Sequence, residues 1–521
     1  MNNTIDNNVL RTVYFREYER YSLADIKKKF SNDTEKMLAS LLKNGIVKQV
    51  KSSAEEQDLS ELAEEDFALG PIEETTDKFY VFCFVGILLV NGYILKCLPK
   101  YYDFPKEYTG EDCKIADEHL KLVFKVLKKY HRTADEEKIH LYNDSVEGQS
   151  FNFLAVMLYL LQDYHENGLY TNEKPVIDTN GTGEILWDRT INNTFAILQN
   201  GAPFYMELQT RRRVIDENDY FCRLHQAVLE VCSKTLIDEG LLELFELSPA
   251  DVVAEALSNF GEKNYICYRI EQELNVQFNT RKKLLLKTIY AFIRNEGGLQ
   301  ADDHFSMFGT NFFHVIWEAV CKKILQDQLS KKINTIALFS GANANGKTFK
   351  EFIESPLWQG QENSNDLIGK KTFIPDVVSV VEYHKKWYFS IFDAKYYHVK
   401  IVDNQISGQP GIESVSKQFL YEMAYRPLLN GVDITITNSF IFPYKFSGKE
   451  ICMQNWGKVT MPMFTNPLSG GLNYFYGFSL KPIGIILVEP TYFYQVYLND
   501  GNILKDVLPL AEQVGAFYPS L

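Results

Sequence analysis

Two short acidic stretches constrain this chain most: one lies near the start of an apolar segment, and the other directly follows a second apolar segment. Ile374-Pro375-Asp376 lies in the first segment, and Asp393-Ala394-Lys395 directly follows the apolar run Trp387–Phe392. The segments Thr372–Val381 and Trp387–Phe392 both have the composition of buried strands. The polar stretch Tyr383–Lys386 between them suits a hairpin turn. An antiparallel hairpin about this turn places Asp376 opposite residues 393 to 395.

Two carboxylates and one ammonium group therefore meet at one end of the predicted hairpin. Asp393 and Lys395 share a face, because side chains two positions apart on a strand point the same way. Carboxylate oxygens suit Mg²⁺, which lowers the pKa of a bound water and neutralises charge at a phosphate. Lys395 can orient or deprotonate the attacking water and stabilise the developing charge. The structural alternative is that Asp393 caps a turn and Lys395 extends to solvent.

Elements on either side of the hairpin add two candidate residues. Phe312–Cys321 has helical apolar spacing with Glu318 beside the apolar stripe, and a second predicted helix, Glu413–Tyr425, carries Gln418. A strand over Asp433–Phe442 is predicted next. This order resembles the core of the PD-(D/E)xK nucleases, where an early helix often supplies a further acid. The resemblance implies an α/β fold with Glu318 on the metal. Gln418 is a candidate for positioning water or the scissile phosphate, and a surface helix residue is the alternative for both.

Several stretches are similar to the LlaJI family of restriction endonucleases. They are Trp317-Glu318, Ile374–Val378, Phe392–Tyr397, Gly183–Ile191, and Phe84-Val85-Gly86 through to Pro99-Lys100-Tyr101. Members of that family are nuclease subunits that resemble McrC and work with a McrB-like AAA+ motor that hydrolyses GTP. The resemblance implies a Mg²⁺-dependent DNA endonuclease, the cleavage subunit of a restriction system used in phage defence. It implies Mg²⁺ held by Asp376, Asp393 and Glu318, double-stranded DNA as substrate, and GTP bound by the partner subunit.

A competing motif lies between the early helix and the hairpin. Gly341–Thr348 fits the P-loop pattern, with Ile336–Phe339 as its leading strand; Lys347 would reach the terminal phosphates and Thr348 would bind Mg²⁺. Pro356 shortens the following helix, and a nucleotide-binding sheet needs repeated strand–helix units that this interval cannot hold. We prefer the nuclease interpretation. A P-loop NTPase motor subunit and a non-catalytic scaffold of a restriction complex stay as alternatives.

Composition sets the outer limits. The net charge of −14 over 521 residues is unlike that of a general DNA-binding protein, so phosphate contacts require local basic surfaces. Three basic runs are available, although each also suits a solvated helix face: Lys27-Lys28-Lys29, Arg211-Arg212-Arg213 and Arg281-Lys282-Lys283. The N-terminus lacks the pattern of a signal peptide, no apolar run is long enough to span a bilayer, and the cysteines are scattered. We therefore expect a cytoplasmic protein without a membrane partner.

The expected organisation is α+β and multidomain. Residues 1–52 suggest a winged-helix-like unit, built from helices over Leu23–Phe30 and Glu35–Lys43 and a strand after Gly45. An acidic linker is expected over residues 53–78. Residues 79–305 begin with strands and continue as a largely helical region, to which the McrC-like resemblance gives an interaction or DNA-contact role. Residues 306–521 form the predicted PD-(D/E)xK endonuclease domain.

Overall fold

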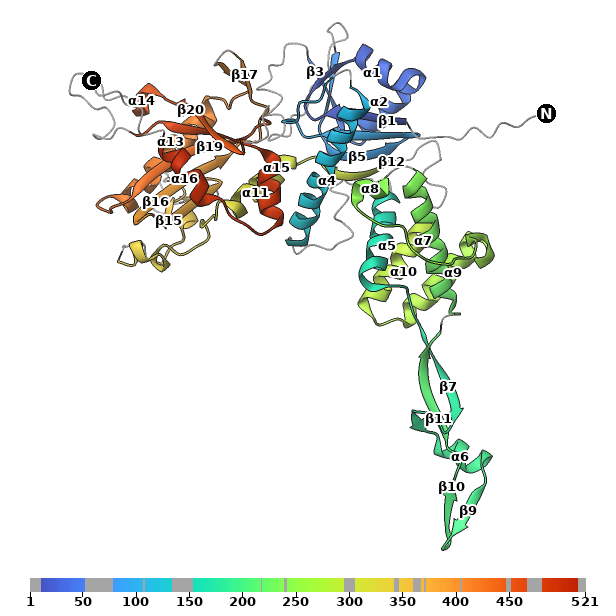
Figure 1. The fold of residues 1–521 in the computed structure, drawn as a ribbon. Helices are drawn as coiled ribbons and strands as arrows, with labels where there is room; N and C mark the ends of the chain where they lie inside the picture. The colour runs from blue at the N-terminus through green and yellow to red at the C-terminus, as the bar shows by residue number, and fades with distance from the viewer. Residues whose placement is uncertain are drawn as a thin grey trace, which may run out of the picture. The chain divides into compact units, whose positions relative to one another are not determined.

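The computed structural model shows a mixed α/β protein (Figure 1). It describes residues 11–51, 78–105, 108–133, 153–216, 218–238, 241–294, 305–341, 346–358, 367–369, 372–402, 405–446, 451–465 and 480–513. Nearly all of the predicted acidic linker and the middle of the P-loop-like motif lie outside these ranges. The chain divides into two compact units: residues 1–11 with 147–307, and residues 12–146 with 308–521. In these described ranges, no helix is long and apolar enough to cross a membrane.

The second unit begins with two small sheets. One has the strand order β1-β6-β5-β12, and the other has the order β2-β4-β3. Their bounds are β1 Arg11–Arg16, β6 Tyr93–Leu98, β5 Val85–Val90, β12 Phe305–Thr310, β2 Arg20–Ser22, β4 Lys78–Phe82 and β3 Val47–Lys51. Strands β5 and β12 approach closely at Gly86, where an added Cβ would lie 2.2 Å from the carbonyl oxygen of Phe308. Only glycine fits this position, since its φ of +143° also disfavours other residues.

The two predicted N-terminal helices are present as α1 (Leu23–Phe30) and α2 (Thr34–Lys43). A capping box begins α1, because the Ser22 side chain accepts from the Asp25 backbone N–H and the Asp25 carboxylate accepts from the Ser22 N–H. Ile26 and Phe30 are buried on one side of α1. Strand β3 follows α2 and pairs antiparallel with β4. Helix α4 (Gly110–Thr133) follows the strands.

The first unit combines a group of helices with a long β arm. The helices are α5 Phe153–Asn167, α7 Tyr220–Asp238, α8 Leu241–Phe245, α9 Lys263–Val276 and α10 Thr280–Arg294. The arm consists of β7 Glu173–Thr179, β8 Glu184–Ile185, α6 Trp187–Asn193, β9 Ala196–Gln199, β10 Ala202–Tyr205 and β11 Gln209–Ile215. Antiparallel pairing of β7 with β11 carries the arm away from the helices (Figure 1). A largely helical region was predicted here, and that prediction missed the arm.

The sheet that carries the predicted nuclease residues has the order β15-β16-β19-β21-β20. Its strands are β15 Val377–Tyr383, β16 Lys386–Ala394, β19 Thr435–Pro443, β21 Ile483–Val488 and β20 Met453–Val459. The two edge strands pair antiparallel with their neighbours, and β16, β19 and β21 run parallel. Every residue of β21 is buried, which matches the continuous apolar run that identifies a strand covered on both faces.

Helices cover both faces of this sheet. They are α11 Phe313–Ile324, α12 Phe349–Phe352, α13 Ile412–Leu429, α14 Pro462–Thr465, α15 Pro490–Leu498 and α16 Leu504–Gln513. On one face Phe389 and Ile391 pack with Tyr425 of α13, and Phe440 and Phe442 pack on the same face with Phe419 of that helix. Short ladders join β13 Leu357–Trp358 to β14 Leu367–Ile368, and β17 Lys400–Val402 to β18 Gln405–Ser407. Short 3₁₀ turns over Ser31–Asp33, Leu257–Phe260, Ile333–Thr335 and Ala337–Phe339 connect longer elements.

Candidate active site

The hairpin of β15 and β16 has the predicted register. His384 and Lys385 have φ angles of +49° and +61°, as both central residues of a tight two-residue hairpin turn require. Tyr383 pairs with Lys386, and Val377 pairs with Phe392 at the other end. Asp376 therefore stands directly before β15 and next to the end of β16. Its Oδ2 accepts a hydrogen bond from the backbone N–H of Ala394 at 2.9 Å.

Asp393 is the most buried carboxylate of the predicted set. It is 5% exposed, and Lys395 Nζ lies 3.2 Å from its Oδ2. Burial raises the pKa of Asp393 well above its usual range, and the charge of Asp376 raises it further. Lys395 acts in the opposite direction without cancelling these effects. Two carboxyl groups and one ammonium thus meet at the end of the hairpin, as the sequence predicts.

Glu318 reaches the same group from α11. Burial and the charge of Asp376 together raise the pKa of Glu318 to about 7, while Lys322 and Lys395 lower it. Its Oε2 lies 3.5 Å from Lys322 Nζ, one turn along the helix. The helix buries Ile316, Trp317 and Val320, with Trp317 stacked on Phe493 of α15, whereas Glu318 is half-buried. The structure therefore brings Glu318 into the electrostatic neighbourhood of Asp376.

Gln418 is placed differently. It is fully buried in α13, where its Nε2 donates to Asn438 Oδ1 at 2.6 Å and its backbone carbonyl accepts from Asn438 Nδ2 at 3.1 Å. The surface alternative for this residue is wrong. Its described hydrogen bonds are to Asn438, and its suggested role at water or phosphate stays a prediction.

Tyr421, one turn further along α13, is the neighbour that the sequence analysis missed. Burial and the charges of Asp393 and Asp376 raise the pKa of Tyr421, and Lys395 lowers it. Its ring contacts Phe373 with centroids 6.3 Å apart. The signal was available in the spacing, because residues three apart on a helix lie on neighbouring parts of one face.

The P-loop-like motif lacks the elements that such a loop needs. Ala337–Phe339 forms a 3₁₀ turn instead of the expected leading strand. The helix after the motif, α12, has only four residues, and Thr348 serves as its N-cap by accepting from the Glu351 backbone N–H. Lys347 pairs with Glu354 at 2.5 Å. This geometry contradicts a nucleotide-binding strand–loop–helix, so the NTPase motor interpretation is wrong for this segment.

The predicted basic runs are largely occupied by contacts within the chain. On β11, Arg211, Arg212 and Arg213 lie 2.6, 2.7 and 3.9 Å from carboxylate oxygens of Glu184, Asp178 and Glu173. Arg281 pairs with buried Asp163 at 2.8 Å, and Lys282 Nζ donates to the Thr171 carbonyl. On α1, Lys29 Nζ donates to the Tyr14 carbonyl at 2.9 Å, whereas Lys27 and Lys28 are exposed.

Comparison with known proteins places the chain in a family. The profile of the LlaJI restriction endonucleases matches residues 84–465. The chain belongs to the LlaJI restriction endonuclease family. It is 27% identical over 382 residues to the type II restriction enzyme BsuMI component YdjA of Bacillus subtilis, a match that covers 72% of this chain and 75% of that protein. Family membership makes the chain a nuclease component of a restriction system.

Two solved structures from Thermococcus gammatolerans show weaker likeness. A half-complex of McrB AAA+ hexamers with bound McrC matches with 12% identity and a TM-score of 0.34, covering 94% of this chain and 99% of the matched chain. A McrBC complex matches with 14% identity and a TM-score of 0.22, covering 60% and 87%. TM-scores in this range do not establish a shared fold.

Proposed function

We propose that the chain is the DNA-cleaving subunit of a multi-protein restriction system, and that it hydrolyses phosphodiesters with Mg²⁺ at a PD-(D/E)xK site. The observation that carries the proposal is the convergence of Asp376, Asp393 and Lys395 at one end of the β15–β16 hairpin. The order of α11, hairpin, α13 and the parallel strand β19 supports the PD-(D/E)xK assignment.

The chemistry of the acids fits a hard divalent cation. Burial and the neighbouring Asp376 disfavour the ionised form of Asp393, as its raised pKa shows, and a bound cation would stabilise that ionised form. Asp376 and Asp393 would hold the ion, with Glu318 as a further oxygen donor. Among the described residues, no three His, Cys, Asp or Glu side chains already form a metal-binding group. Mg²⁺ is commonly held by one or two carboxylates together with water and substrate phosphate.

In this proposal the acids hold the metal ion, and Lys395 stabilises the charge that develops at the phosphate. When bound, Mg²⁺ supplies an acidic water and neutralises charge at the phosphate. Asp376 is kept in place by the Ala394 N–H, and its ligand oxygen is therefore oriented before DNA binds. The ammonium of Lys395 is held by Asp393 and can donate to a phosphate oxygen or to the attacking water. The half-buried position of Lys395 shields these interactions from bulk water.

Plasmid cleavage by the purified chain with Mg²⁺, the proposed GTPase partner and GTP tests this function. Asp376→Ala and Asp393→Ala should each abolish cutting, because each removes an oxygen ligand, and each should weaken Mn²⁺ binding measured by calorimetry. Wild-type cleavage rates in both variants would favour the non-catalytic scaffold, which recruits a nuclease from elsewhere.

We propose a McrB-like AAA+ GTPase as the partner, on the family resemblance and on the tip of the β arm. Apolar side chains there are unusually exposed: Phe195 is 97% and Leu198 is 74% exposed, and Phe204 and Met206 are also exposed. A protein surface rarely presents several large apolar side chains together unless another molecule covers them. The arm has no core of its own, so a partner that buries this tip would also stabilise the arm.

The N-terminal elements support, as a proposal, the winged-helix-like unit. Helices α1 and α2 followed by the paired strands β3 and β4 have the required order. Lys27 and Lys28 are exposed, whereas Lys29 lies over the rings of Phe15 and Tyr108. Replacing Lys27 and Lys28 by Ala should reduce the salt dependence of DNA binding.

A further inference from the structure

The segment that follows Lys395 leaves the sheet yet stays buried. Strand β16 ends at Ala394, and residues 395–399 have no regular secondary structure. The Lys395 N–H donates to the Ile441 carbonyl at 3.0 Å, and beyond it the ring of Tyr397 packs against Phe442 of β19. Tyr396, Tyr397 and Val399 are each less than 5% exposed. The direction in which Lys395 leaves the strand therefore depends on how the side chains of this segment are held.

Residues from the start of the chain hold Tyr396. Its hydroxyl donates to Glu17 Oε2 at 2.6 Å and accepts from the backbone N–H of Lys100 at 3.2 Å. The same N–H also lies 3.3 Å from Glu17 Oε2. Lys100 Nζ stands over the ring of Tyr396 at 4.6 Å and over that of Tyr397 at 5.3 Å. One hydroxyl thus joins three segments that lie 83 to 379 positions apart in the sequence.

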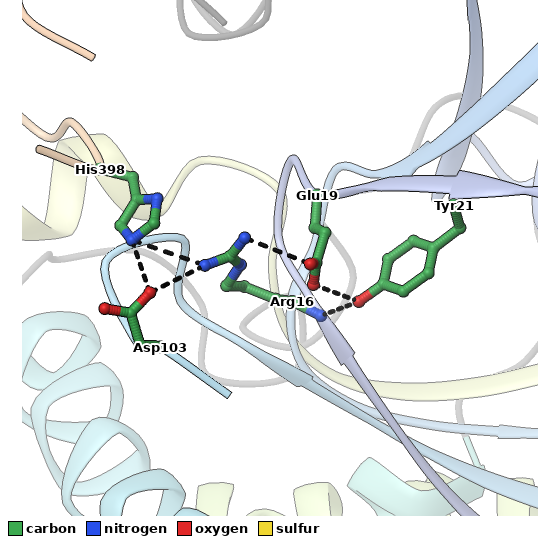
Figure 2. Close-up of polar contacts among 5 residues, drawn as sticks. All are labelled: Arg16, Glu19, Tyr21, Asp103 and His398. Atoms are coloured by element: carbon green, nitrogen blue, oxygen red, sulfur yellow. Dashed lines mark hydrogen bonds and ion pairs between the residues drawn. The ribbon is translucent and has the colours of Figure 1, made fainter. Parts of the chain in front are cut away.

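A second contact holds the other end of the segment (Figure 2). His398 Nε2 lies 2.9 Å from Asp103 Oδ1, and Arg16 Nη1 lies 3.2 Å from the same oxygen. Arg16 is in turn fixed by Glu19 at 3.3 Å. Asp103 is largely exposed, so this contact is the weaker of the two. Both contacts join residues 16–17 and 100–103 to residues 396–398.

Glu17 and Lys100 are costly residues to bury. They are 2% and 4% exposed, and a buried charge destabilises the folded state unless partners compensate it. The sheet itself does not require them, because apolar residues of similar volume would fill the same space at no electrostatic cost. The two residues instead fix the position of Tyr396, because the Glu17 carboxylate accepts a hydrogen bond from the Tyr396 hydroxyl. This points to a role in geometry.

We propose that Glu17 and Lys100 are positioning residues for the nuclease centre, and that they act through Tyr396 to fix the main chain at Lys395. The proposal rests on the proposed function of Lys395. It also assigns the turn between β1 and β2, and the loop after β6, to the cleavage machinery. The N-terminal residues are then not a detachable DNA-binding module, and their deletion would impair cutting as well as binding.

The test is Tyr396→Phe, which removes one hydroxyl and keeps the ring under Lys100. Tyr388→Phe is the matched control. Tyr388 lies on β16, the strand that leads to Tyr396, at the end remote from Asp393, and its hydroxyl also donates to a carboxylate, Glu512 Oε2, at 2.8 Å. Single-turnover plasmid cleavage is measured in the complete complex with partner, GTP and Mg²⁺, alongside DNA affinity and thermal stability. Tyr396→Phe should cut more slowly, by on the order of tenfold or more, at unchanged DNA affinity.

Two further measurements separate positioning from general stability. Hydrogen exchange should rise in peptides covering residues 395–399 in Tyr396→Phe and stay at the wild-type level in Tyr388→Phe. Glu17→Gln, which keeps an acceptor for the Tyr396 hydroxyl, should retain most of the cleavage rate that Glu17→Ala loses.

Cleavage at the wild-type rate in Tyr396→Phe, or unchanged exchange at residues 395–399, would overturn the proposal. A rate loss that Tyr388→Phe shares, or that follows the melting temperature, would overturn it as well. Absence of cleavage by the wild-type complex would instead contradict the proposed function, and the exchange experiment would still decide whether Glu17 and Lys100 hold the segment.

Discussion

Lys395 and Lys347 provide the sharpest test of which residues perform the chemistry. Lys395 Nζ lies 3.2 Å from Asp393 Oδ2, a separation at which two unit charges interact by about 5 kcal/mol at an effective dielectric constant of about 20. An interaction of similar size with the phosphate would form as negative charge develops there. Removal of one preorganised donor of this kind typically slows a reaction by roughly 10²–10³-fold, or about 3–4 kcal/mol. Lys395→Ala should therefore lose at least two orders of magnitude in single-turnover cleavage.

Lys347→Ala is the matched control for this prediction. Lys347 pairs only with exposed Glu354 among the contacts described for it, and a surface pair contributes about 0–1 kcal/mol to stability. Cleavage and the dependence on GTP should both stay within about twofold of wild type. Plasmid cleavage with circular dichroism as the folding control measures both variants. An active Lys395→Ala together with an inactive Lys347→Ala would refute the assignment of the centre to the hairpin.

Three other outcomes follow from the structure. Burial raises the pKa of Glu17, so its contribution to stability is complete below the unfolded pKa near 4.5 and is lost as pH rises through the folded pKa. The melting temperature of Glu17→Gln should therefore rise relative to that of the wild type between pH 4.5 and neutrality. A difference in melting temperature that is independent of pH would contradict this. Gly86→Ala should destabilise the second unit by about 1–3 kcal/mol or more in denaturant unfolding, because its Cβ would meet the Phe308 carbonyl, whereas Gly110→Ala has open space and should be neutral. Replacing both Phe195 and Leu198 by Ser should reduce binding of the proposed GTPase partner, and binding at the wild-type level would remove the arm tip from the proposed interface.

The hairpin was predictable because its information is local. Continuous apolar runs define the strands, the turn lies between them, and the register of Asp376 with the end of β16 follows from counting residues. The helix that carries Glu318 was predictable for the same reason, since it shows a clear apolar stripe. Family membership agrees with the resemblance of these stretches.

Other features left no local signal. The arm strands β7 and β11 are mostly exposed on both faces, so they lack the alternation of buried and exposed residues that identifies a strand. Glu17 and Tyr396 meet across 379 positions of sequence, and nothing near either residue indicates the other. The P-loop-like motif shows the opposite error: eight residues matched a pattern, but the strand and helix that give the pattern its meaning did not form.

Residues 147–307 form an insertion in the chain, because the second unit contains the sequence on both sides of them. Strand β12 spans the C-terminal boundary of the insertion and pairs with β5, which precedes the insertion in the sequence. Exchange of the insertion at a point before Phe305 therefore leaves this strand of the host intact. If the arm binds the partner as proposed, a restriction system built on this plan can change that partner while the proposed cutting centre is inherited intact, and chimaeras that exchange the insertion should transfer partner choice from one system to another.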